Sequence, residues 1–90
     1  MELDYVVIAV MYSTQGQSLF WRANQSGYTF NLDEAGRYTR EEALSCQRKR
    51  GPDFEDIAVP LAVAESKARL RISDDDAHDW RRQLKEGKTL

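Results

Sequence analysis

The segment with the most obvious potential for chemistry is the acidic run DDDAHD, residues 74–79, which contains the only histidine of the chain. If this run is helical, Asp74 and His78 stand one turn apart, where a carboxylate and an imidazole could share a metal ion. A metal site needs three or four ligands, and the sequence offers no second cluster. We therefore interpret the acids as a helix start, where negative charge complements the helix dipole, and expect no metal and no cofactor.

Cys46 and His78 are the only thiol and imidazole in the sequence. Cys46 falls in the middle of a predicted helix, away from the positive helix end that activates thiols. The sequence contains no motif for a serine nucleophile, a phosphate-binding loop or a zinc protease. We expect no catalytic residues, and therefore a protein that is not an enzyme.

Two other groups of residues could bind a partner. The basic run Arg48–Arg50 could hold phosphate, although we favour a role in the last turn of a helix. Phe20 and Arg22 share one face of a predicted strand if Trp21 points inward, because side chains alternate. Two interpretations of that face are open. In the first, which we favour slightly, a helix covers the face; in the second, the face is an exposed contact patch. Aromatic and arginine side chains are enriched at protein interfaces and also stack on single-stranded nucleic acid.

The composition restricts the class of protein. The 90 residues are 41% hydrophobic and 31% charged, which fits one globular domain over residues 1–90. The formal net charge is −2, whereas an unselective nucleic-acid binder usually carries a basic surface. A lone cysteine allows no internal disulfide, which favours a reducing compartment. We expect a cytoplasmic protein whose partner is a protein more readily than a nucleic acid.

The elements that must position these residues begin with the apolar run Tyr5–Tyr12. It is far shorter than the ~20 residues that span a bilayer, and no basic signal-peptide region precedes it. We therefore expect no membrane partner. Apolar residues fall on both of its faces, which predicts a central strand covered on both sides.

A β-hairpin is predicted next, with strands Leu19–Ala23 and Tyr28–Leu32 around the turn Asn24–Gly27. An even number of loop residues places the apolar side chains of both strands on one face, whereas an odd number would separate them. In the version with a four-residue loop, Trp21 lies opposite Phe30.

A helix is predicted from Arg40 to about Arg50, before Gly51. Its N-terminus carries a capping box, in which Thr39 is the N-cap and Glu42 reaches back to it. The preceding turn, Asp33–Gly36, would use the freedom of Gly36 to adopt a positive φ.

The C-terminal half is less regular in pattern. Residues 57–59 favour a short strand, and residues 60–67 favour a helical turn followed by a strand over 68–73. One helix over 60–72 is the competing interpretation. A final helix follows from the acidic run to about Gly87, with Trp80 and Leu84 on its apolar face.

These elements together predict an α+β fold. A small antiparallel sheet, made of the central strand plus the hairpin, packs with two main helices. An exposed sheet edge could pair across a dimer axis, so a homodimer is also possible.

Part of the sequence resembles a known pattern. The residues are Trp21-Arg22, Asn24, Gly27-Tyr28-Thr29, Leu32, Ala35-Gly36, Tyr38-Thr39 and Glu42-Ala43. They are similar to a signature of small uncharacterised phage and prophage proteins, W-[RK]-P-N-x-x-G-Y-T followed by L-x-x-A-G-x-Y-[ST]-x-E-E-A. Ala23 stands where that signature usually has proline.

The resemblance implies a mobile-element origin and assigns no chemistry to any residue. Small phage-borne proteins of this class, anti-CRISPR proteins among them, often inhibit bacterial defence systems by binding. We therefore expect a non-enzymatic protein that binds and blocks a host or phage protein complex. The binding residues expected are Phe20, Arg22, Asp74, Asp75, Asp76 and Asp79. The alternative is a nucleic-acid-associated regulator that uses Phe20, Arg22 and the cluster Arg48-Lys49-Arg50.

Overall fold

The structure is a computed structural model that describes residues 2–10, 18–67 and 74–90. Within these ranges it contains five strands, three α-helices and two short 3-10 turns. The elements are β1 (Tyr5–Ala9), β2 (Phe20–Trp21), η2 (Ala23–Gln25), β3 (Tyr28–Thr29), η3 (Leu32–Glu34), α1 (Arg40–Cys46), β4 (Arg48–Arg50), β5 (Asp53–Pro60), α2 (Leu61–Lys67) and α3 (Asp74–Lys85). No helix among the described residues is long and apolar enough to cross a membrane.

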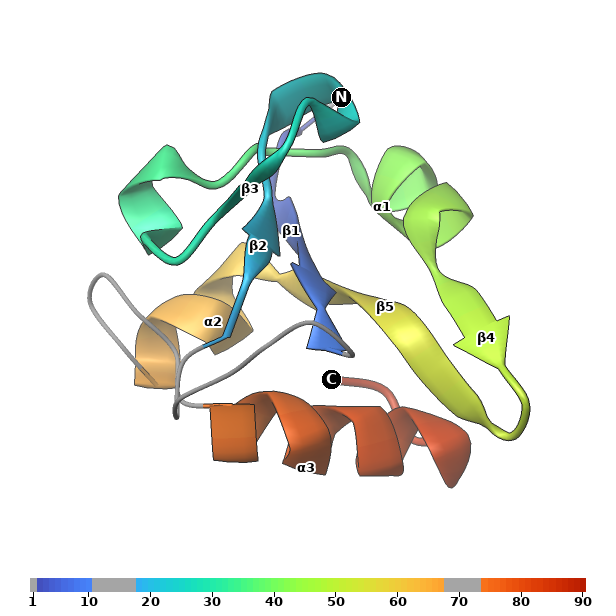
Figure 1. Cartoon of the computed structure of the whole chain (residues 1–90). Helices are drawn as coiled ribbons and strands as arrows, with labels where there is room; N and C mark the ends of the chain where they lie inside the picture. Colours follow the sequence, from blue (N-terminus) through green and yellow to red (C-terminus); the bar gives the residue numbers. More distant parts are fainter. Residues whose placement is uncertain (1, 11–17, 68–73) are drawn as a thin grey trace.

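The strands form one antiparallel sheet in the order β3-β2-β1-β5-β4 (Figure 1). Helices α2 and α3 pack on one face, where Ile8, Phe20 and Trp80 share the larger core. Helix α1 packs on the opposite face, where Val7 and Ala43 share a smaller core. The predicted α+β fold is therefore confirmed, although the described residues contain three helices instead of two main ones.

β1 is the central strand, as its composition predicted, and it pairs with β2 and β5. Val6, Val7, Ile8 and Ala9 are all fully buried. Neighbouring side chains enter opposite cores because side chains alternate along a strand, which explains why the run needs apolar residues at every position. Met11 and Tyr12, the end of the predicted run, lie outside the described residues.

β5 is longer than the predicted strand and includes residues 57–59. It ends at Pro60, after which α2 begins at Leu61, whose N–H donates to the carbonyl oxygen of Asp4 at 2.7 Å. The structure thus confirms a helix up to Lys67. The predicted strand over 68–73 and the end of the competing helix lie outside the described part of the chain.

The hairpin has a tighter turn than predicted. Its pairs are Phe20 with Thr29 and Trp21 with Tyr28, so the four-residue version with Trp21 opposite Phe30 is wrong. Asn24 and Gln25 both adopt left-handed φ values, 57° and 56°. This conformation suits a two-residue hairpin turn, because its twist matches that of the strands. An even loop, and with it the shared face of Trp21 and Tyr28, is nevertheless observed.

Helix α1 begins as predicted and ends early. The Thr39 hydroxyl accepts from the N–H of Glu42 at 3.2 Å, and the Glu42 carboxylate accepts from the N–H of Thr39 at 3.0 Å, which confirms the capping box. The helix stops at Cys46, so the interpretation of Arg48–Arg50 as its last turn is wrong. These residues instead pair with β5 as strand β4, and Gly51 forms the turn between the two strands.

Gly36 has a different role from the predicted one. It does not adopt a left-handed φ. A Cβ at this position would lie 2.5 Å from the backbone nitrogen of Ala23, and its own N–H donates to the carbonyl oxygen of Trp21 at 2.9 Å. Gly36 is therefore required because two backbone segments pass close together.

Candidate functional site

Phe20 is the first predicted binding residue, and it is fully buried. It lies in the larger core beneath α2 and α3, in the cluster that includes Ile8 and Trp80. The prediction that Phe20 contributes to an exposed contact patch is therefore wrong. The preferred alternative, a face covered by helices, is the one observed, because the short strand β2 completes the hydrophobic face that α3 needs.

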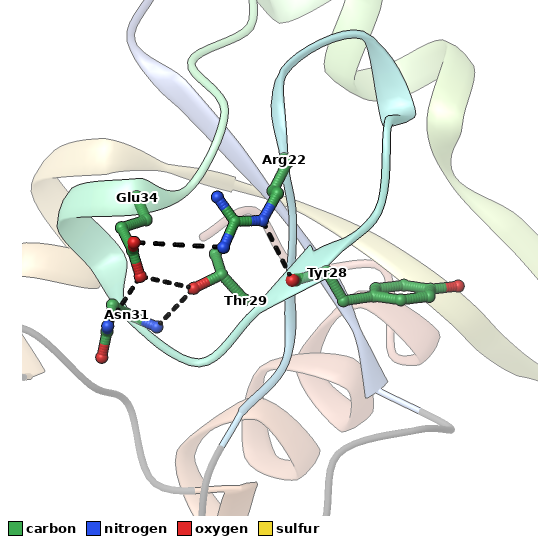
Figure 2. Close-up of polar contacts among 5 residues, drawn as sticks. All are labelled: Arg22, Tyr28, Thr29, Asn31 and Glu34. Carbon is green, nitrogen blue, oxygen red and sulfur yellow. Dashed lines mark hydrogen bonds and ion pairs between the residues drawn. The ribbon is translucent and has the colours of Figure 1, made fainter.

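Arg22 is exposed and holds the hairpin together. Its Nε donates to the carbonyl oxygen of Tyr28 at 3.2 Å, and its guanidinium lies 3.9 Å from the Glu34 carboxylate (Figure 2). Glu34 also accepts from the Thr29 hydroxyl at 3.1 Å and from the Asn31 amide at 2.7 Å. The hydrogen bonds from Asn31 and Thr29 lower the pKa of Glu34 below 4.5. We call Arg22, Thr29, Asn31 and Glu34 the edge cluster.

The predicted acidic residues lie on a different part of the molecule. Asp74 and Asp75 are the first two residues of α3, and Asp76 is half-buried in its first turn. The Asp79 carboxylate accepts from the Gln83 amide at 2.9 Å and pairs with Arg82, both within the same helix. The structure does not bring these acids together with Arg22, whose side chain bonds to its own hairpin and to η3.

Cys46 and His78 lie on opposite sides of the sheet. Cys46 ends α1 and belongs to the smaller core, whereas α3, which carries His78, packs on the larger core. The two side chains therefore cannot act as a nucleophile and its base. In the parts of the chain that the structure describes, no group of three or more metal-ligating side chains comes together.

The surface with the strongest binding character is the aromatic pair Trp21 and Tyr28. Their ring centroids are 4.3 Å apart with an interplanar angle of 39°. Tyr28 is 38% exposed, and Figure 2 shows its ring pointing to the opposite side from Glu34. The pair lies on the α1 side of the sheet, because Trp21 packs against the smaller core.

The side chain of Trp21 is held in place by the buried carboxylate of Asp56. Its indole N–H donates to Asp56 at 3.1 Å, although β1 lies between their two strands. Asp56 is only 4% exposed, and this burial raises its pKa, while the hydrogen bond from Trp21 acts in the opposite direction. The ring that supports Tyr28 therefore lies across the sheet in a defined position.

A polar groove adjoins the hairpin tip. Its lining consists of Asn24, Gln25, Tyr38, Glu42, Ser45 and Cys46, and its volume is about 260 Å³. The Tyr38 hydroxyl donates to the carbonyl oxygen of Arg22 and accepts from the N–H of Gln25, and burial raises the Tyr38 pKa. The Gln25 amide donates to the Cys46 sulfur at 2.9 Å. Amide, hydroxyl and carboxylate groups of this kind suit the polar backbone of a peptide.

The basic run lies at the far end of the sheet. Strand β4 is separated from β2 by β5 and β1, so Arg48 and Lys49 do not share a surface with Arg22. Lys49 instead places its ammonium 5.0 Å from the centre of the Phe54 ring. The surface proposed for nucleic-acid binding, formed by Phe20, Arg22 and this run, is therefore not continuous.

The sequence interpretation missed the importance of Tyr28 and Asp56. One signal was present for each. A largely buried tryptophan needs a hydrogen-bond acceptor for its indole N–H, and an acid inside the strand pattern of β5 is a candidate acceptor. For Tyr28, the signal was the face that it shares with Trp21 in a hairpin with an even loop, which places the two rings together but does not give the exposure of Tyr28.

Comparisons with known proteins add no relative. A scan against protein-family models, a search of curated proteins and a search of solved structures each found no match. The resemblance to phage and prophage proteins therefore stays a prediction, and the functional argument depends on the geometry of the site.

Proposed function

We propose that the protein is a non-catalytic interaction module that binds a protein partner through the hairpin surface. This surface consists of Trp21, Tyr28, Asn24, Gln25, Glu42 and Ser45. The observation that carries the proposal is the exposed Tyr28 ring packed at a tilt against Trp21. Aromatic side chains with a rigid setting are the usual anchors of protein interfaces.

The Trp21–Tyr28 pair would bind a partner at a low cost in conformational entropy. Trp21 is held by Asp56, and the hairpin tip is held by the Tyr38 hydroxyl, so few rotamers are lost on binding. The polar groove next to the pair supplies hydrogen-bonding groups around an aromatic centre. This arrangement of an apolar centre with a polar rim is typical of protein interfaces.

The resemblance to phage proteins suggests a finer proposal. The partner would be a host or phage complex, and the protein would block it, as inhibitors of bacterial defence do. An acidic helix start, with Asp76 and Asp79, could add charge complementarity to a basic cleft of such a complex. This part depends on the resemblance alone. It is tested by phage plating on a host with active CRISPR interference, with and without the expressed protein.

The interaction module is tested by quantitative affinity capture from a lysate of the native host. Tyr28→Ala removes the exposed ring. Phe30→Ala is the matched control, because Phe30 is 36% exposed and does not belong to the Trp21–Tyr28 pair. We expect a partner that wild type and Phe30→Ala capture equally and that Tyr28→Ala captures about tenfold less. Equal capture by all three proteins, or no saturable partner, would contradict the proposal.

A parallel titration separates the nucleic-acid alternative. Labelled single-stranded and double-stranded oligonucleotides are added at two salt concentrations, because phosphate contacts make affinity depend strongly on salt. Salt-dependent binding that Tyr28→Ala weakens would favour nucleic acid as the partner of this surface.

A further inference from the structure

Strand β4 forms one margin of the sheet, as Figure 1 shows at the right of the molecule. Among the described residues, β5 is the only strand that pairs with it. An edge strand presents backbone N–H and C=O groups along its outer side, and these groups can pair with another extended segment. The outer side of β4 is therefore a candidate site for strand addition.

Every residue of β4 is basic, and two of its three partners on β5 are acidic. Arg48 lies opposite Asp56, and Arg50 lies opposite Asp53. Burial is the main cause of the raised pKa of Asp56, and the charge of Arg48 acts against it as a smaller contribution. On its inner side, β4 is thus already paired with a segment that carries acidic residues.

A bulge shapes this edge. Arg48 pairs with Asp56 and Lys49 with Phe54, so Glu55 is an extra residue on β5. The bulge brings Phe54 against the larger core and places Lys49 above the Phe54 ring. Arg48 and Lys49 stay exposed, on opposite faces of the strand, so a strand added at this edge would meet a cation on each face.

A second copy of this chain does not suit the edge. An antiparallel pair of β4 strands centred on Lys49 would place Lys49 opposite Lys49 and Arg48 opposite Arg50. Like charges directly opposite each other destabilise a strand pair. The basic side chains therefore act against a homodimer through β4, while they favour a strand of the opposite charge.

We propose that the outer edge of β4 binds an extended acidic segment of a partner protein by strand addition. The backbone of the segment pairs with β4, and its carboxylates lie beside Arg48 and Lys49, as Asp56 of β5 lies opposite Arg48 on the inner side. The proposal is independent of the hairpin surface, because β3 and β4 are the two opposite margins of the sheet.

The test uses a fluorescein-labelled synthetic peptide of alternating glutamate and valine. Its binding to the full chain is followed by fluorescence anisotropy, and the exchange of the Arg48–Arg50 backbone amides is followed by NMR. Three probes serve as controls: the same peptide with lysine in place of glutamate, the acidic peptide with every backbone nitrogen methylated, and a single-stranded oligonucleotide. The methylated peptide keeps the charge but has no backbone donors.

The acidic peptide is expected to bind and to slow amide exchange in β4, and the lysine and methylated peptides are expected to bind about tenfold more weakly or not at all. The double variant Arg48→Gln/Lys49→Gln should bind the acidic peptide about tenfold more weakly, and its circular dichroism spectrum should be unchanged. Equal binding of the methylated peptide would overturn strand addition. Failure of the acidic peptide to bind, or tighter binding of the oligonucleotide at the same amides, would overturn the proposed partner.

Discussion

The two margins of the sheet are built in opposite ways. At the β3 margin, the chain folds back and the edge cluster forms hydrogen bonds with itself, so that Thr29 and Glu34 satisfy each other (Figure 2). At the β4 margin, three consecutive basic residues form the edge, and Arg48 and Lys49 remain exposed. One margin is closed by its own side chains, and the other has side chains suited to an external strand.

The contrast separates charged side chains that hold the fold together from charged side chains that are available for binding. Arg22 was a predicted binding residue, but its guanidinium is committed to the Tyr28 carbonyl and to Glu34. The basic run was predicted as a helix end and is instead the strand edge. The same residue type therefore has different roles, and the difference comes from whether local partners satisfy it.

The largest effect is expected at the base of the hairpin. Phe20→Ala removes a fully buried ring from the larger core and should cost about 4 kcal/mol of unfolding free energy. Phe30→Ala, at an exposed position, should cost about 1 kcal/mol or less. Urea denaturation followed by tryptophan fluorescence measures both. Similar losses would mean that Phe20 does not anchor this margin as described.

The second prediction compares the glycines near the two margins. Gly36→Ala forces a Cβ to within 2.5 Å of the Ala23 nitrogen, so the backbone must move, at a cost of about 3 kcal/mol. Gly51→Ala meets no atom within 4 Å, and only its φ of 65° opposes the substitution, at a cost of about 1 kcal/mol. Thermal unfolding of both variants gives the order. The reverse order would contradict the close packing of Gly36.

The third prediction tests the edges themselves. Thr29→Val removes a hydroxyl that is shared with Glu34 and with the Asn31 N–H, and should cost about 1 kcal/mol. Lys49→Gln at the other margin should change stability by less than about 0.5 kcal/mol, since Lys49 is exposed. Chemical denaturation of the two variants measures the difference. A larger loss for Lys49→Gln would show that β4 charges stabilise the fold.

The smallest effect is a pH dependence at Asp56. Burial raises the pKa of Asp56, so the folded state binds a proton at this carboxyl more tightly than the unfolded chain does. The stability that this proton contributes is lost as the pH rises through the folded-state pKa. Asp56→Asn cannot ionise and keeps an acceptor for Trp21. It should gain about 1 kcal/mol or less near neutral pH, and the gain should shrink as pH falls toward 3.8.

Glu42 provides the control of opposite sign. Hydrogen bonds from the Thr39 backbone and hydroxyl lower its pKa, so its contribution is present above 4.5 and lost as pH falls. Glu42→Gln should therefore be less stable than wild type near neutral pH and approach it in acid. Thermal midpoints across a pH series measure both variants. If both variants were more stable than wild type near neutral pH, or both were less stable, the opposite pKa shifts of Asp56 and Glu42 would be contradicted.

Much of the fold followed from local patterns. The capping box at Thr39 and the apolar run of β1 act over a few residues, so the sequence determined them directly. The end of α1 did not follow, because Arg48–Arg50 has a helix-compatible sequence and becomes a strand only by pairing with the acidic part of β5. That pairing is a tertiary contact without a local signature.

The candidate site was less predictable than the fold. Hairpin parity correctly joined Trp21 and Tyr28 on one face, but it did not say which face the helices would cover. Phe20 was therefore named as a binding residue although a covered face was slightly favoured, and Tyr28 was overlooked. The choice is made by α2 and α3, which cover the Phe20 side.

The most direct test of the contrast between the margins is backbone amide exchange in the presence of the acidic peptide. Exchange should slow at Arg48–Arg50 and remain unchanged at Tyr28 and Thr29, because only the β4 margin accepts an added strand. Slower exchange at both margins, or at the β3 margin alone, would contradict the account.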